Sequence, residues 1–338
     1  MRTFWLFRSN LKHLEYYHQY GDLETFEEKC HDFYMLFPIW LLRKNYFDNV
    51  VIWRLSKNPP KEINFNVNGK MYSQRWVRNF SEVINHPKPE ISFFRGGFQE
   101  YDQLTRSIPN HLGKKLYLAT GRRITPQWGG KYNLFLQEDM ADFSKGYNCI
   151  PFYKTASARI FYPKNQVPRY EICWPANFKQ IRYKGHGDFI KAVGQSEYLS
   201  SLSIVSCGNK PKVGKELCKK YGVNNIEFKG EVKRDELNSI LNQSRFGLCM
   251  SNRQDGCPRV VTEILMAGTP LLVRDQTRLL PYYKKLGAMV LTDQKLEKRI
   301  EKANDMWTKM KEEVLLARKD ILSFEKICEK NMELWRKI

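Results

Sequence analysis

The stretch from Asp255 to Pro270 constrains what this chain can fold into more than any other segment. An apolar run, Phe246–Met250, precedes it and has the length of a buried strand. Pro258 stands where a helix would have its first position, and Gly268 stands just past the expected end of that helix. A second apolar run, 271–273, then follows. The order strand, acidic loop, short helix, tight turn and strand is typical of an α/β domain.

The start of this predicted helix is suited to an anion. Backbone N–H groups near Arg259 and Val260 would have no partner within the helix, so they would attract a phosphate. Asp255 in the loop and Glu263 inside the helix stand eight residues apart, and both are placed to accept sugar hydroxyls beside that phosphate. The alternative is structural, because two acids near a helix start often only favour its dipole.

Three more strand-like segments precede this unit and alternate with helical ones. The strand-like segments are 171–176, 203–208 and 226–230, and the helical patterns lie near 188–193, 215–220 and 232–241. This alternation predicts a parallel, doubly wound sheet, whose ligands sit beyond the carboxyl ends of the strands. The basic loop that ends in Lys184-Gly185, the turn around Lys229 and the acids Asp255 and Glu263 are therefore expected at one edge of that sheet.

The order of these features resembles glycosyltransferase family 4, whose members are retaining enzymes of the GT-B architecture. The resemblance implies an α/β fold with two Rossmann-like domains facing each other across a cleft. Asp255 takes the place of the first Glu of the family's E-x7-E motif, and Glu263 is the second. Lys184-Gly185 matches the family's Lys-Gly pair. The Arg that the family places five residues earlier is Lys179 here, which leaves Lys179 or Arg182 for that role.

Two flanking segments extend the resemblance, which covers residues 150–338 and is weak over 1–149. The segment from Ile150 to Pro163 is similar to the family's interdomain segment, and 323–335 is similar to its closing helix. The implied division is an N-terminal acceptor-side Rossmann-like domain at 1–163, a nucleotide-sugar-binding Rossmann-like domain at 164–318, and a closing helix at 319–338 that packs back on the first domain.

The resemblance also implies roles for residues on the donor side. Glu263 would hold the donor ribose, while Asp255 and the backbone of Gly256 and Cys257 would hold hexose hydroxyls. Lys184, with Lys179 and the helix start, would neutralise the diphosphate as it leaves. The residues expected to bind the donor are Lys179, Arg182, Lys184, Lys229, Asp255, Gly256, Cys257, Pro258, Arg259, Val260 and Glu263, of which Lys184, Asp255 and Glu263 are expected to act in catalysis.

The expected reaction is a metal-independent, retaining transfer of a hexose from a nucleotide sugar. No Asp-x-Asp motif, of the kind that holds a metal diphosphate in single-domain glycosyltransferases, occurs in the sequence. No cofactor is expected besides the nucleotide sugar, which is a co-substrate. GDP-mannose is the first guess for the donor, on its frequency in the family, and a UDP-sugar is the second. The expected acceptor is a glycan, a glycoprotein or a lipid.

The N-terminal half suits a second α/β domain, with strand-like runs at 3–7, 50–55, 63–67, 91–94, 115–119 and 132–136. Two turns follow the ends of such runs. Gly96 and Gly97 allow close approach of the backbone to a ligand, or only a tight turn. Arg122 and Arg123 would hold an acceptor or donor phosphate, or only coat the surface. The paired glycines after the first strand and the later histidine that many family members have are missing, so the acceptor side has diverged.

The net charge of +20, from 56 Lys and Arg against 36 Asp and Glu, predicts an anionic partner. Nucleoside diphosphates, anionic glycans, lipid phosphates and nucleic acid all qualify. No aromatic RNA-binding motif, zinc-finger spacing or helix-turn-helix signature occurs, so the sequence has no dedicated nucleic-acid module. Two alternatives to an active enzyme are a nucleotide- or glycan-binding protein that has lost catalysis and a basic nucleic-acid-binding protein.

A cytoplasmic location is expected. The eight cysteines include no Cys-x-x-Cys pair, which favours buried thiols in a reducing compartment. Residues 1–8 lack the features of a signal peptide, and no run approaches the ~18 apolar residues that span a bilayer. The apolar run 33–42 is either a buried element or a surface that docks on a membrane. Peripheral membrane contact and a homodimer are both left open.

Overall fold

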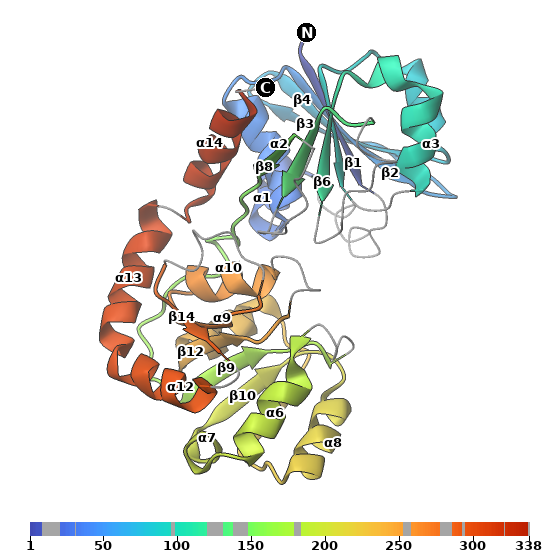
Figure 1. Cartoon of the computed structure of the whole chain (residues 1–338). Helices are drawn as coiled ribbons and strands as arrows, with labels where there is room; N and C mark the ends of the chain where they lie inside the picture. Colours follow the sequence, from blue (N-terminus) through green and yellow to red (C-terminus); the bar gives the residue numbers. More distant parts are fainter. Residues whose placement is uncertain are drawn as a thin grey trace. The chain divides into compact units, whose positions relative to one another are not determined.

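The computed structural model describes residues 1–8, 21–30, 32–95, 99–119, 131–137, 148–178, 184–252, 258–277, 286–292, 295–320 and 322–336. These residues divide into two compact units (Figure 1). The first unit holds the described chain up to Phe152 together with the last residues from Leu334, and the second holds Tyr153–Glu333. Each unit is built on one largely parallel sheet.

The described strands of the first unit form a sheet in the order β3-β4-β2-β1-β5-β6-β7-β8. Their pairings are parallel except for β3 and β4, which form a hairpin. Asn68 and Gly69 join that pair with positive φ, the conformation that a two-residue hairpin turn requires. The strands are β1 (Thr3–Arg8), β2 (Asn49–Leu55), β3 (Ile63–Val67), β4 (Lys70–Val77), β5 (Ile91–Arg95), β6 (Lys114–Ala119), β7 (Leu134–Gln137) and β8 (Cys149–Pro151). The helices described with them are α1 (Leu23–Lys29), α2 (Phe33–Arg43), α3 (Gln99–Ser107) and the 3-10 helices η2 (Phe80–Asn85) and η3 (Pro109–Leu112).

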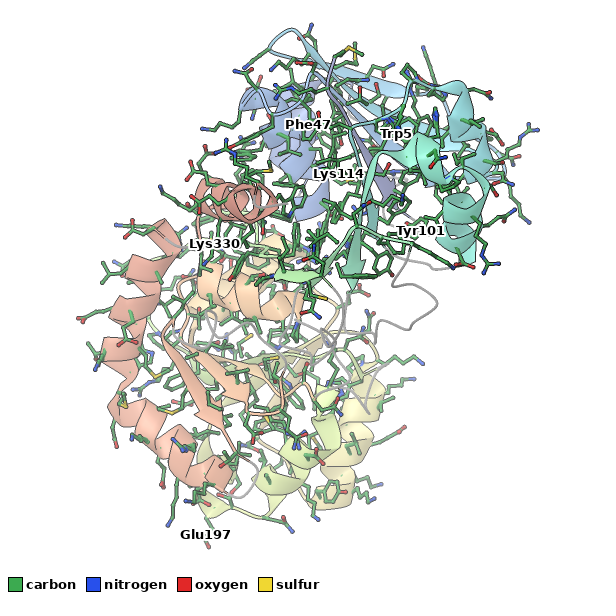
Figure 2. The ribbon with its side chains drawn as sticks, turned by 45° about the horizontal axis from the view of Figure 1, so that its top comes forward. Trp5, Phe47, Tyr101, Lys114, Glu197 and Lys330 are labelled. Carbon is green, nitrogen blue, oxygen red and sulfur yellow. The ribbon has the colours of Figure 1, made fainter. Side chains whose placement is uncertain are left out.

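The central strand β1 is buried on both faces, as expected in the middle of a covered parallel sheet. Trp5 and Phe7 lie on one face, in a cluster of aromatic side chains that includes Tyr101 (Figure 2). Phe7 stacks on Phe94 of the neighbouring strand β5, with 4.7 Å between the ring centroids. Aromatic residues make up 14% of the sequence, and this core accounts for their concentration in the N-terminal half.

The apolar run expected at 33–42 is a helix in the interior of the first unit. α2 continues through Pro38, and its buried side chains include Phe37, Trp40 and Leu41. Of the two readings of this run, the buried element is the one observed. No helix in the described ranges is long and apolar enough to cross a bilayer.

The described strands of the second unit form a sheet in the order β11-β10-β9-β12-β13-β14, and all of these pairings are parallel. Counted from β9, this is the 3-2-1-4-5-6 order of a doubly wound Rossmann sheet. The strands are β9 (Tyr170–Pro175), β10 (Ile204–Cys207), β11 (Ile226–Gly230), β12 (Ser244–Cys249), β13 (Leu271–Arg274) and β14 (Ala288–Leu291). The helices are α6 (His186–Gly194), α7 (Glu197–Ser201), α8 (Pro211–Tyr221), α9 (Arg234–Asn242), α10 (Arg259–Met266), α12 (Leu296–Asp305), α13 (Trp307–Asp320) and α14 (Phe324–Trp335).

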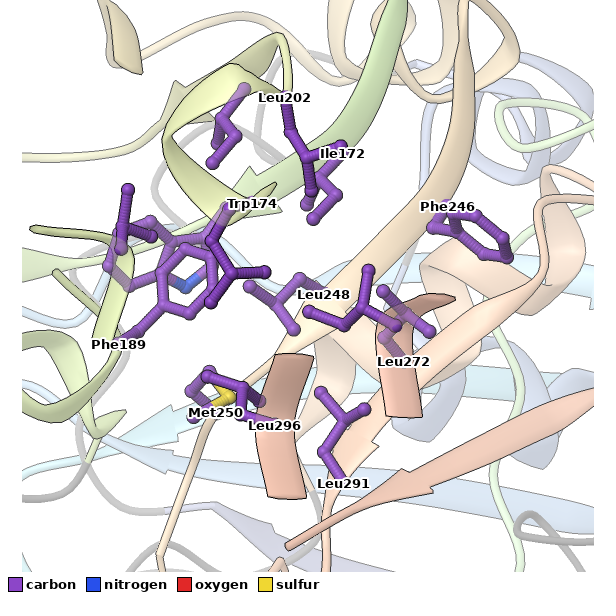
Figure 3. Close-up of a cluster of buried hydrophobic side chains, with 14 of the residues drawn as sticks. Ile172, Trp174, Phe189, Leu202, Phe246, Leu248, Met250, Leu272, Leu291 and Leu296 are labelled. Carbon is purple, nitrogen blue, oxygen red and sulfur yellow. The ribbon is translucent and has the colours of Figure 1, made fainter. Parts of the chain in front are cut away.

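Apolar side chains from the sheet and its helices make the core of the second unit (Figure 3). Trp174 of β9, Leu248 of β12 and Leu272 of β13 contribute from the sheet. Phe189 of α6 and Leu296 of α12 contribute from the helices. The predicted alternation of strands and helices is confirmed, and with it the α/β fold of two Rossmann-like domains.

The end of α14, from Leu334, belongs to the first unit. Trp335 is buried there. Its ring centroid lies 5.5 Å from that of Phe37, 6.1 Å from that of Phe152 and 6.4 Å from that of Phe4. The expectation that the C-terminal helix returns to the first domain is confirmed.

Replacing Trp335 with Ala should lower the free energy of unfolding by about 3–5 kcal/mol, because a large buried ring is lost and a cavity remains. Denaturant unfolding of the full chain measures the change. The control is Leu316→Ala on α13, whose side chain is 66% exposed, and it should change stability by no more than about 0.5 kcal/mol. Equal effects of the two substitutions would show that α14 does not dock through Trp335.

Candidate functional site

β9 and β12 lie side by side at the centre of the second sheet, and the strands that follow each of them are added on opposite sides. The carboxyl ends of two such strands form the switch point of a doubly wound sheet, where ligands bind in this class of fold. Three segments reach this edge: the loop from β9 into α6, the loop from β12 into α10, and the end of β13. The first two contain the Lys-Gly pair and the acidic helix singled out from the sequence.

Gly185 holds the β9–α6 loop against the end of β12. Its φ is +63°, and a Cβ at this position would lie 2.2 Å from the carbonyl oxygen of Met250, the residue after β12. Only glycine fits so close an approach. Lys184-Gly185 therefore lies at the carboxyl end of β12.

A second cation, Arg274, meets Gly185 from the end of β13. Its Nη1 lies 2.9 Å from the place that a Cβ of Gly185 would take, and it pairs with Oδ2 of Asp188 at 2.8 Å. Arg274 is buried, whereas Asp188, in the first turn of α6, is exposed. Sequence reasoning missed Arg274. The available signal was a charged residue at the last position of the apolar strand 271–274.

His186, which follows Gly185, is a neutral imidazole. It is fully buried, and its ring centroid lies 4.4 Å from that of Phe178 and 5.3 Å from that of Trp174. Burial, and next the positive charge of Lys184, lower the pKa of His186 to about 3. The charge of Lys184 therefore acts at the start of α6, close to this ring.

α10 begins one residue later than the sequence predicted. Pro258 is its N-cap, with an extended ψ of 130°, and Arg259 is its first residue. No side chain in the described ranges caps this start. At the other end Gly268 has a φ of +73° and donates to the carbonyl of Leu265 at 3.0 Å, so the helix ends where predicted.

α10 packs tightly on the sheet because β12 has a glycine beneath it. A Cβ at Gly247 would lie 2.5 Å from Cγ2 of Ile264, so any larger residue would lift the helix away. The neighbouring Glu263 is buried at this contact layer, with only 7% of its side chain exposed.

Two arginines hold the carboxylate of Glu263. Its Oε1 pairs with Nη1 of Arg234 and, at 3.3 Å, with Nε of Arg259. Arg234 is the first residue of α9 and was missed from the sequence, since 29 positions separate it from Glu263. A buried carboxylate is stable only with such partners. This pairing fixes the carboxylate next to the start of α10.

Lys229 is engaged elsewhere on the sheet. It lies on β11 and forms an ion pair with Glu227, and this hydrogen-bonded partner raises the pKa of Lys229. Glu227 also accepts from the hydroxyl of Tyr170 at 2.7 Å. Among the described residues, the structure does not bring Lys229 into contact with Lys184 or Glu263.

Several residues singled out from the sequence lie outside the described residues. They are Lys179, Arg182, Asp255, Gly256 and Cys257 on the donor side, and Gly96, Gly97, Arg122 and Arg123 in the N-terminal half. The described part of the candidate site consists of Lys184, Arg234, Pro258–Val260, Glu263 and Arg274. It combines one buried carboxylate, a helix start and several cations, which is a suitable set for a ligand with both hydroxyls and phosphates.

A family comparison covers the part of the chain that contains these residues. Residues 179–314 match the family model of glycosyl transferases group 1. The matched range contains Lys184, Arg234, Glu263 and Arg274. No curated protein matches the sequence of the chain.

Several solved structures share the fold along nearly the whole chain. Sucrose-phosphate synthase from Thermosynechococcus elongatus has a TM-score of 0.68 at 11% identity, over 100% of this chain and 99% of that one. HepE from Anabaena, in complex with UDP, has a TM-score of 0.68 at 11% identity, over 100% of both chains. A glycosyltransferase from Rickettsia africae ESF-5 has a TM-score of 0.67 at 12% identity, over 99% and 98%. The chain therefore has the GT-B fold of these proteins, and its residues 179–314 match the model of glycosyl transferases group 1.

Proposed function

We propose that this protein is a retaining, metal-independent glycosyltransferase of family 4 that moves a hexose from a nucleotide sugar to an acceptor hydroxyl. The observation that carries the proposal is the buried carboxylate of Glu263, whose Oε1 is held by two arginines beside the start of α10. A carboxylate oxygen in this place suits the ribose hydroxyls of a nucleotide, because it accepts the hydrogen bonds that they donate. The start of α10, four residues earlier, suits the diphosphate.

The proposed transfer relies on charge stabilisation rather than on a protein nucleophile. Lys184 and the start of α10 offset the charge that grows as the bond between the hexose and the diphosphate breaks. The acceptor oxygen bonds to the same carbon on the same face, and its proton passes to the departing phosphate oxygen. Arg274 adds positive charge beside Lys184. Asp255, with the backbone of Gly256 and Cys257, is proposed to hold the hexose hydroxyls.

The proposed donor is a UDP-hexose or a GDP-hexose, and the proposed acceptor is a glycan, a glycoprotein or a lipid. HepE is described in complex with UDP and with UDP-glucose. This places UDP-glucose first among the donors to test, ahead of GDP-mannose, which family frequency favours. At 11% identity, the likeness to HepE shows a shared fold only. The nucleotide base and the sugar of the donor are therefore proposals.

Calorimetric titration of the purified protein with UDP-glucose and with GDP-mannose, each in EDTA, should show saturable binding of one of them. Slow hydrolysis or transfer of the bound hexose should follow without added metal, because protein cations carry the charge. Proton NMR of the released or transferred sugar should show the anomeric configuration of the donor. Binding without any hydrolysis would favour a nucleotide-binding protein that has lost catalysis, and rescue by manganese or magnesium would contradict the metal-independent step.

Glu263→Gln should weaken binding of the donor's nucleoside diphosphate by roughly 1–3 kcal/mol, because an amide makes weaker hydrogen bonds to the ribose than a carboxylate. Turnover at saturating donor should change little, since the ribose is held alike in the ground and transition states. The matched control is Glu171→Gln: this partly buried carboxylate accepts from the backbone of Ser203 at 2.9 Å, at the amino end of the sheet. Undiminished binding by a folded Glu263→Gln protein would remove the ribose role.

Lys184→Ala should reduce turnover by about 10²–10³-fold, more than it weakens donor binding, because the charge that it offsets is largest in the transition state. Single-turnover kinetics beside calorimetry separates the two effects. Lys219→Ala, an exposed position on α8, should leave both quantities as in the wild type. A loss in affinity alone would assign Lys184 to ground-state binding.

A further inference from the structure

Three arginines stand side by side at the carboxyl edge of the first sheet. Arg8 ends β1, Arg95 ends β5, and Arg54 is the next-to-last residue of β2. The register pairs Arg8 with Arg54 on one side and with Arg95 on the other. Residues in register on parallel strands point to the same face, with about 4.8 Å between strands. These three side chains therefore form a continuous row, the arginine row.

The arginine row spans the switch point of the first sheet. From β1, the strands β2 and β4 are added on one side, and β5, β6 and β7 on the other. Ligands of doubly wound sheets bind beyond the carboxyl ends of the strands at such a point. The row thus lies where the fold favours a ligand, and the donor site proposed above uses none of its residues.

The arginine row carries more positive charge than its surroundings offset. Arg8 and Arg54 are 3% and 4% exposed, and Arg95 is partly buried. The carboxylate that meets the row in the described part of the chain is Asp32, which pairs with Nη1 of Arg8 at 2.8 Å. Arg54 donates to the sulfur of Met35 at 3.5 Å, a weak acceptor. Three guanidiniums against one carboxylate leave two positive charges without a described counterion.

Buried hydrogen-bond donors around the row also lack acceptors. The guanidinium of Arg95 lies over the ring of Tyr34, 3.8 Å from its centroid. The Nε atoms of Arg8, Arg54 and Arg95 and the hydroxyl of Tyr34 are buried without a hydrogen-bond partner among the described residues. Burial, and next the charge of Arg8, lower the pKa of Arg54 to about 10. Buried donors left unpaired are costly, so an acceptor-rich anion at this place would stabilise the unit.

We propose that the arginine row, with Tyr34, binds a phosphate group of a substrate. A phosphate dianion balances the two excess charges, whereas a carboxylate balances one of them. Phosphate oxygens also match the fork of donors that each guanidinium presents. Tyr34 lies in the first turn of α2, whose positive helix end adds to the attraction. The inference concerns the first unit alone and does not rest on the transfer chemistry proposed for the second.

The first experiment titrates inorganic phosphate into the full chain at constant ionic strength, with chloride replacing phosphate, and follows thermal unfolding and binding heat. Saturable stabilisation is expected. Arg54→Met should weaken phosphate affinity at least about tenfold, yet without phosphate it should melt no lower than the wild type, because an unpaired buried charge is gone. Arg95→Met, at the partly exposed end of the row, should show the same loss of affinity if Arg54→Met does not fold.

The matched control is Arg106→Gln, an exposed arginine on α3 that pairs with Asp102, and it should bind phosphate like the wild type. Stabilisation that rises without saturation, or equally in the control and the row variants, would overturn the site.

The second experiment identifies which substrate carries the phosphate. The donor offers its diphosphate, and a phosphorylated acceptor would offer a phosphate monoester. UDP and a hexose 6-phosphate are therefore each tested for displacement of inorganic phosphate from the wild type. Displacement by UDP assigns the row to the donor, and displacement by the hexose phosphate assigns it to the acceptor. Displacement by neither would mean an adventitious ion only and would overturn a substrate role.

Glu263→Gln keeps the two proposals apart. This variant should retain phosphate affinity at the arginine row even though it binds the nucleoside diphosphate weakly. If it binds the nucleoside diphosphate normally while Arg54→Met loses phosphate, the donor site of the second unit is wrong and the arginine row stands.

Discussion

The close approach of Gly185 to the carbonyl of Met250 ties together the loops that make the candidate donor site. A Cβ at Gly185 would stand 2.2 Å from that oxygen, so the contact is between one backbone and another and does not depend on side-chain rotamers. Lys184 precedes this point, His186 follows it, and Arg274 packs against it from β13. Lys184 and Arg274 therefore owe their positions to a single place where the chain has no room for a side chain.

The burial of the Glu263 carboxylate also depends on a glycine at a close contact. Gly247 lets α10 lie directly on β12, which leaves Glu263 buried rather than exposed on the helix surface. A carboxylate at that depth must be paired, and Arg234 and Arg259 pair with one of its oxygens. The resulting side chain is fixed in orientation, which recognition of a sugar hydroxyl needs.

Both units gather cations at the carboxyl edge of a parallel sheet, but they balance them differently. In the second unit Arg274 meets Asp188, and Arg234 meets Glu263. In the first unit the arginine row meets Asp32 alone among the described carboxylates. Paired cations leave a site that can hold neutral hydroxyls beside phosphates, whereas unpaired ones favour a ligand that is itself strongly anionic. Part of the net charge of +20 is thus buried in the arginine row, and the excess of cations is not confined to the surface.

The amino-acid sequence by itself determined the order of strands and helices, the parallel sheet of the second half and the C-terminal end of α10, because apolar periodicity and residues such as Gly268 act over a few positions. The start of α10 differed by one residue, since the φ of a proline suits both an N-cap and a first helical position. Only the tertiary structure decided which charges meet. Arg234 lies 29 positions from Glu263, and the arginine row depends on the order and register of three strands. Ion pairs form over a few ångströms, and distances of that size between remote segments are set by packing rather than by any local pattern.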